Sequence, residues 1–285
     1  MAKHKKIVFL GNIGDESSFL SIQSLIDKYQ EKGIQAVLID SLNNQDSDSK
    51  MQNAELIVSI GGDGTMLQSA KLAYQYDLPI TGINKGRLGF LTDINPQETD
   101  QVLDDIISGN YTTENRILIE AFISTNSINK SIGYAFNDIV INRKETGRMI
   151  RVETSIDNSF INTHEGDGFI VATPTGSTAY SLSCGGPILK PDVEALLLVP
   201  ICPHSLNDRP MVVPSSSKIT LRYDSEQNVS AGIDLDGDTV YELKIGDNLV
   251  IKKAAKPICL IHPENYDYFD NLKSKLLWGK DKRHE

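Results

Sequence analysis

The sequence predicts two domains of different class, an N-terminal doubly wound parallel α/β domain and a C-terminal all-β, β-sandwich-like domain. Strands and helices alternate through the first third, which is typical of a parallel sheet. From Asn115 onward the chain consists of short segments rich in β-branched residues and separated by turn residues. After residue 263 the pattern is helical again. We therefore expect residues 1–115 and 264–285 to form one domain and residues 116–263 the other.

In the N-terminal domain, apolar runs alternate with stretches of helical periodicity. The expected strands cover residues 6–10, 35–39, 56–60 and 79–83, and the expected helices cover residues 17–32, 66–76 and 97–108. Gly109-Asn110 is expected to end the last of these helices. The segment 43–53 has too little apolar content to pack, so we expect a mobile loop there.

Beyond residue 115 we expect strands almost exclusively. They cover residues 116–124, 131–142, 151–156, 160–163, 168–172, 196–201, 218–223, 229–233, 239–243, 248–252 and 257–261. A helix is expected over residues 266–278, where apolar residues recur at helical spacing. We expect this helix to pack on the N-terminal domain, followed by a charged, frayed end at residues 279–285.

The composition is that of a folded, acidic protein. Hydrophobic residues make up 40% of the 285 residues, and the formal net charge is −10. This charge disfavours nucleic acid and anionic membranes as partners, because binding either requires a basic surface. No apolar stretch is long enough to span a bilayer, and residues 1–6 lack the features of a signal peptide, so we expect a cytoplasmic protein. The spacing of Cys184, Cys202 and Cys259 argues against disulfides or a zinc site and favours reduced, mostly buried thiols.

The segment Gly61-Gly62-Asp63-Gly64-Thr65 follows an expected buried strand and precedes a helix. Glycines permit positive φ angles and let a phosphate reach backbone N–H groups, so Gly61, Gly62, Gly64 and Thr65 are candidate phosphate-binding residues. Thr65 is also the expected cap of the helix. Asp63 would repel a phosphate unless it serves a proton or a metal ion, which makes it the candidate catalytic residue. The alternative is a tight turn in which the aspartate bonds its own backbone.

A second loop, Asn84-Lys85-Gly86-Arg87, follows the next expected strand. In a doubly wound sheet, ligands bind beyond the carboxyl ends of the strands, so both loops should meet at one crevice. Lys85 or Arg87 would then be suited to neutralise charge on a transferred group.

Small residues and hydroxyls dominate the segment from Asp167 to Pro187, and most densely the stretch from Thr173 to Ser183. Because each buried hydroxyl needs a hydrogen-bond partner, this stretch cannot form an ordinary apolar core. It also has too many apolar neighbours to be a plain linker. A loop that lines a ligand site explains both properties, with Tyr180 available to stack on a base. The alternative is a turn that satisfies its own hydroxyls.

Together these motifs resemble the NAD kinase family. The resemblance extends through nearly the whole chain, in Gly61 to Thr65, Gly82 to Asp93, Asn137-Asp138, Thr173 to Pro187, and Pro203-His204-Ser205-Leu206 with Arg209-Pro210. It implies a fold related to those of diacylglycerol kinases and phosphofructokinases. It also implies a phosphotransferase that phosphorylates the 2′-hydroxyl of the adenosine ribose of NAD to give NADP, and a homodimer or homotetramer.

The resemblance implies roles for individual residues. Asp63 matches the acid beside the reacting hydroxyl, with Gly64 next to it. The matches to the dinucleotide-binding residues of the family are Asn137 and Asp138 at ribose or adenine, Thr178, Ala179, Tyr180, Ser181, Leu182 and Ser183 around the bases, Asp167 near the nicotinamide half, and Arg148 at an often basic position. The departures are Asp138, where glutamate is commoner, Glu165, where relatives often carry a basic residue, and Asp238, where glutamine is frequent.

Phosphoryl transfer to a sugar hydroxyl requires an acceptor for the hydroxyl proton, and Asp63 fits this need. Mg²⁺ is expected as the cofactor, held mainly by the donor's phosphates and water, and no protein ligand for it is assigned. The expected substrates are NAD and a phosphoryl donor, ATP or polyphosphate. His204 is either an acid or base or a hydrogen-bonded structural residue. One alternative function is a lipid kinase, which would need a hydrophobic or basic surface that faces the membrane. The other is a non-catalytic dinucleotide sensor, which would not depend on Asp63.

Overall fold

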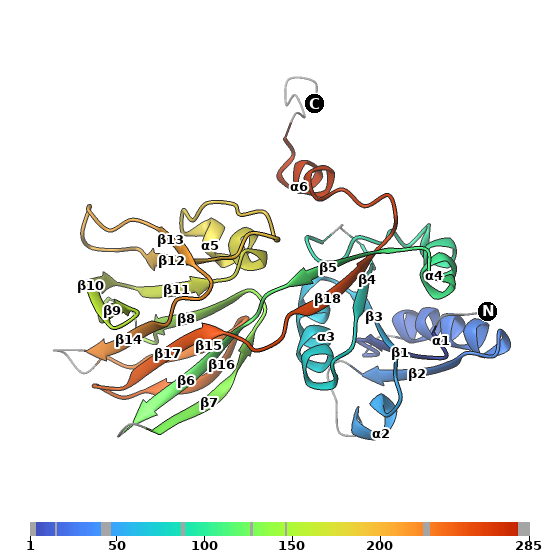
Figure 1. Ribbon diagram of the computed structural model, residues 1–285, viewed down its shortest axis with the longest axis horizontal. Helices are drawn as coiled ribbons and strands as arrows, with labels where there is room; N and C mark the ends of the chain where they lie inside the picture. The colour runs from blue at the N-terminus through green and yellow to red at the C-terminus, as the bar shows by residue number, and fades with distance from the viewer. Residues whose placement is uncertain are drawn as a thin grey trace. The chain divides into compact units, whose positions relative to one another are not determined.

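The computed structural model describes residues 4–14, 16–40, 47–86, 89–125, 128–145, 147–224 and 229–278. The chain forms two compact units, residues 1–115 together with 258–285, and residues 116–257. The first unit is α/β and the second is built almost entirely of strands, as the sequence predicts (Figure 1).

The first unit contains a six-stranded sheet within its described residues, in the order β2-β1-β3-β4-β18-β5. Its strands are β1 (Lys6–Gly11), β2 (Gln35–Asp40), β3 (Leu56–Gly61), β4 (Ile80–Asn84), β5 (Thr112–Arg116) and β18 (Ile258–His262). The helices are α1 (Glu16–Glu31), α2 (Ser47–Met51), α3 (Asp63–Tyr76), α4 (Thr99–Ser108) and α6 (Tyr268–Leu276). Strands β1 to β4 and β18 run parallel. All residues of β1, β3 and β4 are buried, which explains their continuous apolar sequence.

Several predictions for this unit are corrected by the structure. The strand expected at 257–261 in the C-terminal domain is β18, which joins the first sheet beside β4 with Leu260 opposite Ile80. Residues 258–263 therefore pack with the first unit, because this apolar strand finds its backbone partners there. Strand β5 was not predicted. Residues 47–51 form helix α2 instead of a loop, while residues 43–46 lie outside the described part of the chain.

The helix ends follow simple capping chemistry. Gly109 ends α4 as predicted, with φ of 99° and its N–H bonded to the carbonyls of Asp105 and Ile106. Helix α6 is shorter than expected and begins after Asp267, whose carboxylate accepts the N–H groups of Phe269 and Asp270. The frayed end expected at 279–285 lies outside the described residues. Among the helices that the structure describes, none has the length and apolar character needed to cross a lipid bilayer.

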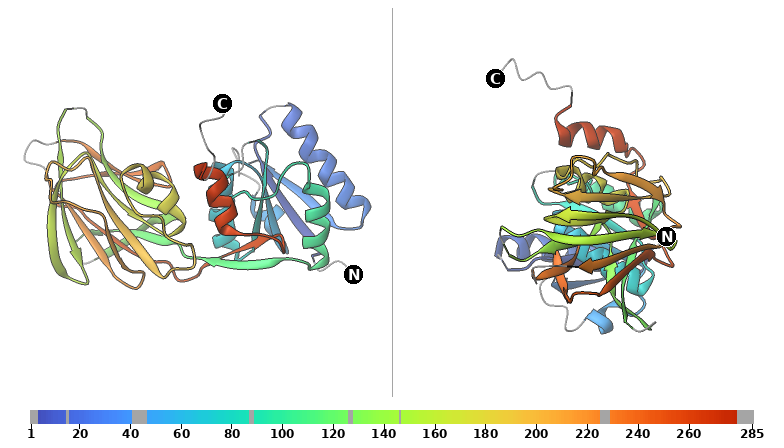
Figure 2. Two further views of the ribbon diagram at one scale, coloured as in Figure 1. Left: turned by 90° about the horizontal axis from the view of Figure 1, so that it is seen from above. Right: turned by 90° about the vertical axis from the view of Figure 1, so that its left-hand side faces the viewer.

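The second unit is a sandwich of two antiparallel sheets, each with six strands in the described residues (Figure 2). One has the order β10-β9-β14-β17-β6-β7 and the other β13-β12-β11-β8-β15-β16. The bounds are β6 (Ile119–Thr125), β7 (Ile128–Ala135), β8 (Asp138–Arg143), β9 (Ile150–Ile156), β10 (Ser159–Gly166), β11 (Gly168–Ala172), β12 (Ala195–Ile201), β13 (Met211–Pro214), β14 (Ile219–Asp224), β15 (Ala231–Leu235), β16 (Asp238–Leu243) and β17 (Asn248–Lys253). One apolar core, with residues from both sheets such as Ile119, Ile141 and Leu221, holds the layers together.

Two differences in this unit concern the candidate site. The strand expected over 131–142 is two strands, β7 and β8, which are interrupted at Phe136-Asn137. The expected loop after β11 contains a 3₁₀ turn, η1 (Thr175–Thr178), and a short helix, α5 (Tyr180–Ser183). Strand β13 was not predicted.

The three cysteines are free thiols, and one of them is not buried as expected. Cys184 packs against the apolar cluster beneath α5, and burial raises the pKa of its thiol. Cys259 is half-buried, whereas Cys202 is exposed, so the prediction of burial is wrong for Cys202.

Candidate active site

The segment Gly61–Thr65 lies at the junction of β3 and α3, in the first unit. Helix α3 begins at Asp63, with Gly62 as its N-cap, so the prediction that Thr65 caps the helix is wrong. No side chain in the described residues caps this end. The first turn of a helix has N–H groups without intrahelical partners and carries the positive end of the helix dipole. This turn can therefore bind an anionic group.

The carboxylate of Asp63 is held in a fixed orientation by the loop that follows β4. One oxygen accepts the N–H of Phe90 at 3.0 Å and the other accepts the N–H of Leu91 at 3.0 Å. The side chain remains half-buried rather than enclosed. A carboxylate has about four lone-pair sites, so two bonds leave room for a further donor such as a hydroxyl.

Two glycines allow this arrangement through close packing. A Cβ at Gly89 would lie 2.0 Å from Oδ1 of Asp63, and a Cβ at Gly61 would lie 2.3 Å from Oγ1 of Thr65. Gly62 and Gly64 are exposed, and no described atom lies within 4 Å of a Cβ built on them. The prediction of positive φ at Gly61, Gly62 and Gly64 is wrong, since φ at Gly62 is −99° and the other two are absent from the positive-φ glycines of the described chain.

The start of the loop after β4 is held by Asn84. Asn84 is buried, and its Oδ1 accepts the N–H of Gly86 at 2.6 Å, which fixes the start of the loop. Lys85 is exposed, and Arg87 lies outside the described residues.

In the second unit, the junction Phe136-Asn137-Asp138 is clamped by the carboxylate of Asp236. This carboxylate accepts the N–H groups of Phe136 at 2.9 Å, Asn137 at 2.7 Å and Asp138 at 3.2 Å. The N–H of Asp236 in turn donates to the carbonyl of Asp138 at 3.0 Å. Three consecutive amides on one carboxylate fix the backbone at the interruption between β7 and β8.

The hydroxyl-rich segment closes on the same junction from the other side. Thr173 donates its hydroxyl to the carbonyl of Phe136 at 2.6 Å and its N–H to the carbonyl of Asn137 at 2.8 Å. A Cβ at Gly176 would lie 2.1 Å from the carbonyl oxygen of Asn137. The structure thus brings Asn137 and Asp138 together with the segment that begins at Thr173.

Asp138 is a buried carboxyl group with two acidic neighbours. Its exposed fraction is 4%. Burial, and then the charges of Asp236 and Asp234, raise the pKa of Asp138 to about 7. This side chain therefore exchanges its proton near neutral pH.

The segment Thr175 to Ser183 satisfies some of its own hydroxyls and presents others. Ser177 bonds the backbone of Leu189, and Thr178 donates to the carbonyl of Thr175 at 3.3 Å. The bond of Thr178 favours, for that hydroxyl, the alternative of a self-satisfied turn, whereas the bonds of Ser177 tie the segment to the backbone of a later residue. Tyr180 is 47% exposed, and Ser183 is also exposed. Thr178, Ala179 and Leu182 are half-buried, whereas the side chain of Ser181 is fully buried.

The remaining predicted residues lie around β10 and β11. Asp167 forms a two-pronged ion pair with Arg143, with distances of 2.9 Å and 3.1 Å. Arg148 is exposed, and its carbonyl accepts a bond from the same arginine. Glu165 pairs with Arg151 at 3.2 Å, and the side chain of His204 is exposed.

Comparison with known proteins identifies the family. Residues 8–111 match the model of the ATP-NAD kinase N-terminal domain and residues 136–263 that of the ATP-NAD kinase C-terminal domain. Proteins named NAD kinase from Thiobacillus denitrificans and Pseudoalteromonas translucida are 44% and 42% identical over 227 and 228 residues, which is 80% of this chain and 78% of each relative. The chain belongs to the NAD kinase family. Both clusters of candidate residues fall within the matched ranges.

Solved structures of NAD kinases have the same fold. The yeast NADH kinase complexed with NADH superposes with a TM-score of 0.84 at 24% identity, covering 99% of this chain and 90% of that one. The NAD kinase of Archaeoglobus fulgidus in complex with ATP gives a TM-score of 0.74 at 27% identity, covering 95% and 98%. These neighbours agree with the expected combination of an α/β and a β-rich domain.

Sequence reasoning missed the NAD kinase residues that hold others in place. The sequence gives no indication of the roles of Asp236, Arg143, Gly89 and Gly176. The Asp-Gly pair at 236–237 signals a turn, and Asp236 does adopt a positive φ of 51°. The sequence holds no sign that this turn reaches back to residues 136–138.

Proposed function

We propose that the protein is an NAD kinase that transfers a phosphoryl group from ATP to the 2′-hydroxyl of the adenosine ribose of NAD, giving NADP. Relatives of this name at 42–44% identity support the activity. The observation that carries the proposal is the carboxylate of Asp63, oriented by two backbone amides at the uncapped start of α3. A proton acceptor and an anion-binding turn then occupy consecutive residues.

In the proposed reaction, Asp63 accepts a hydrogen bond from the 2′-hydroxyl and takes its proton as the oxygen attacks the γ-phosphorus atom of ATP. The bond between that phosphorus and the β,γ-bridging oxygen breaks, and ADP leaves. The N–H groups of the first turn of α3, with Gly61, Gly62, Gly64 and Thr65, bind the donor's phosphates. Fixed amides need no reorientation as charge develops, which favours the transition state.

Mg²⁺ fits this site as an ion brought by the donor. The described residues contain no group of three or more histidine, cysteine or acidic side chains that could hold a metal. Phosphate oxygens and water would then supply most of its ligands, with Asp63 as the nearest candidate carboxylate. The ion would neutralise charge on the transferring phosphoryl group.

For the dinucleotide, we assign Asn137 and Asp138 to the ribose and adenine. Their backbone is clamped by Asp236 and Thr173, so their side chains start from a fixed position. Tyr180 would stack on a base, with Thr178, Ala179, Leu182 and Ser183 beside it and Ser181 contributing through its backbone. Asp167 and Arg148 would contact the nicotinamide half. We further propose a cytoplasmic homodimer or homotetramer without nucleic-acid or membrane partners.

The test is an acceptor and donor panel with purified protein. Incubation with NAD, ATP and Mg²⁺ should give NADP, detected by an NADP-specific dehydrogenase, and diacylglycerol should not be phosphorylated. Polyphosphate in place of ATP tests the second donor. Asp63→Asn should lower kcat by about 10²–10⁴-fold. Phosphorylation of diacylglycerol in place of NAD would favour the lipid kinase, and binding of NAD with no turnover under any donor would favour the sensor.

A further inference from the structure

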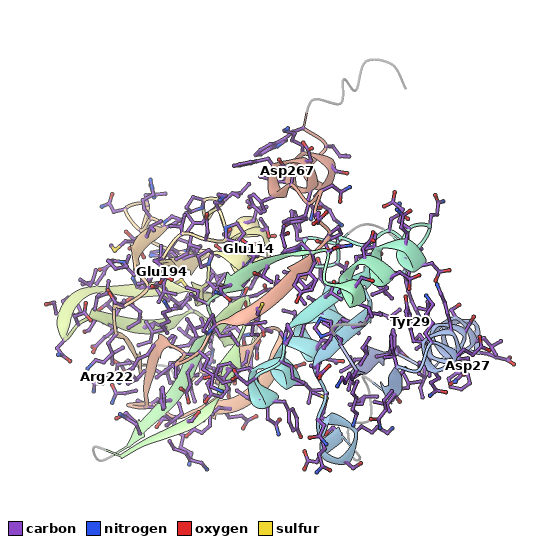
Figure 3. All side chains as sticks on the ribbon, turned by 45° about the vertical axis from the view of Figure 1, so that its right-hand side comes forward. Asp27, Tyr29, Glu114, Glu194, Arg222 and Asp267 are labelled. Atoms are coloured by element: carbon purple, nitrogen blue, oxygen red, sulfur yellow. The ribbon has the colours of Figure 1, made fainter. Side chains whose placement is uncertain are left out.

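The ring of His262, the last residue of β18, is buried between two carboxylates of the first unit. Its exposed fraction is 4%. Nδ1 lies 2.5 Å from Oδ2 of Asp93, in the loop after β4, and Nε2 lies 3.3 Å from Oε2 of Glu114. Glu114 is labelled in Figure 3 on β5, the strand next to β18 in the sheet. One histidine therefore connects a loop with two strands of this unit.

The surroundings hold this ring in one plane and favour its charged form. The ring stacks on Tyr266, with centroids 3.9 Å apart and planes inclined by 8°. Ionisable groups thus meet the ring from the loop after β4, from β5 and from the segment that follows β18. A neutral imidazole donates from one nitrogen only, and its other nitrogen would direct a lone pair at a carboxylate. The protonated ring donates from both, which makes its bond to Asp93 a strong, charge-assisted one.

Asp93 lies directly after the turn that orients Asp63. In this turn, residues 89–92, the N–H of the first residue donates to the carbonyl of the last at 3.3 Å. The two central residues, Phe90 and Leu91, donate their N–H groups to the carboxylate of Asp63. One residue separates Leu91 from Asp93. A displacement of Asp93 is therefore passed to the two amides through a short, bonded stretch of chain.

Further anchors of the same stretch are backbone bonds to β4. The N–H of Asn84 donates to the carbonyl of Ile94 at 2.9 Å, and the N–H of Ile94 donates to the carbonyl of Gly82 at 3.2 Å. These bonds hold the chain after Asp93, whereas the contact with His262 holds the side chain of Asp93 itself. Since a misplacement of about 1 Å can cost about 10²-fold in rate, a side-chain tie this close to the amides matters for the reaction.

We propose that His262 is a positioning residue for Asp63. Its ring holds Asp93, and Asp93 fixes the end of the turn 89–92. The turn in turn supplies two N–H groups to the carboxylate of Asp63. The effect on catalysis rests on the proposed function, whereas the coupling between the ring and the turn does not.

Two substitutions at His262 separate its contact with Asp93 from its contact with Glu114. The amide nitrogen of asparagine is attached to Cγ, as Nδ1 of histidine is, and that of glutamine lies one bond farther out, as Nε2 does. His262→Asn therefore keeps a donor directed at Asp93, and His262→Gln keeps one directed at Glu114. Both variants lose the charge of the ring and its stack on Tyr266, so they are matched in other respects.

Amide hydrogen exchange of the full chain measures the coupling without the kinase reaction. In His262→Gln the N–H groups of Phe90 and Leu91 should exchange at least about tenfold faster than in the wild type, because the turn opens more often. In His262→Asn the increase should be less than about threefold. The N–H of Ile57 on β3, which donates to the carbonyl of Pro79 at 3.0 Å, reports on opening of the sheet and should not distinguish the two variants.

Steady-state formation of NADP measures the effect on catalysis. His262→Gln should lower kcat at least about tenfold, with a KM for NAD within about threefold of the wild type, and His262→Asn should lower kcat less than about threefold. In an Asp63→Asn background, His262→Gln should change kcat less than about threefold, because the carboxylate that it would misplace is already absent.

Equal exchange of the two amides in the Asn and Gln variants would show a purely structural role and overturn the proposal. A tenfold loss of kcat that persists in the Asp63→Asn background would also overturn it. If no NADP forms but the two variants differ in exchange as expected, the proposed function fails and the coupling stands. Circular dichroism establishes that each variant is folded. If His262→Gln does not fold, Asp93→Asn, which weakens the same contact from the other side, replaces it with the same expected direction.

Discussion

Asp63 and Asp138 are both aspartates in candidate binding positions, but their surroundings differ in kind. Asp63 is half-buried, and each of its oxygens accepts a backbone N–H. Asp138 is buried beside two carboxylates, and burial first, then the charges of those carboxylates, raise the pKa of Asp138 to about 7. A carboxylate that receives amide donors is kept as an oriented acceptor, whereas one crowded by acids holds its proton to higher pH. The contrast matches the two roles proposed for these aspartates, proton transfer for Asp63 and hydroxyl recognition for Asp138.

The largest expected effect tests whether Asp236 maintains the junction that carries Asp138. Asp236→Ala leaves three amides without their acceptor and should lower the free energy of unfolding by about 3–5 kcal/mol. The KM for NAD should rise at least about tenfold with a smaller change in kcat. Urea unfolding and steady-state kinetics measure both quantities. Asp238→Asn, at an exposed position on β16, is the control for loss of one charge. Equal changes in unfolding free energy and in KM in this control would refute the proposed role of Asp236 at the junction.

The second prediction concerns the proton on Asp138. Because its pKa is raised in the folded state, the folded protein holds a proton that the unfolded chain releases between about pH 4 and pH 7. The contribution of Asp138 to the stability of the wild type should therefore fall across this range as pH rises. Asp138→Asn lacks this loss and should be more stable than the wild type at pH 8 by about 2–4 kcal/mol, with little difference at pH 4. Melting temperatures across this range check the sign, and a difference independent of pH would contradict it.

The smallest effect concerns the loop that orients Asp63. Gly89→Ala places a Cβ against Oδ1 of Asp63, so the loop or the carboxylate must move. We expect a loss of about 1–3 kcal/mol in stability and a fall in kcat of about 10–100-fold. Gly86→Ala in the same loop meets no described atom within 4 Å and should be near wild type. Similar kcat values for the two variants would mean that the two amides do not fix the carboxylate of Asp63 for its proposed role.

Local sequence patterns predict most of the helices and strands. They do not predict which strands pair when the partners are distant in the sequence. The buried strands β1, β3 and β4 and the glycine stop after α4 follow from composition and spacing. Strand β18 has the same apolar pattern as its neighbours in the chain, and only its pairing with β4 places it in the first sheet. No sequence pattern specifies that choice of partner.

The candidate site shows the same division. Asp63 was recognisable because a carboxylate among glycines at the end of a buried strand is chemically unusual. Asp236 was not, because its bonds span 98 to 100 residues of chain. Residues that bear the chemistry can be found from local sequence, whereas residues that position them depend on the folded partner.

The most direct test of the account is to measure NAD binding and turnover together in Asp63→Asn. If Asp63 is the proton acceptor, calorimetry should give a dissociation constant for NAD within about threefold of wild type, while kcat falls by about 10²–10⁴-fold. Turnover near the wild-type rate, or a loss of NAD binding that accounts for the whole loss of activity, would contradict the role of this carboxylate.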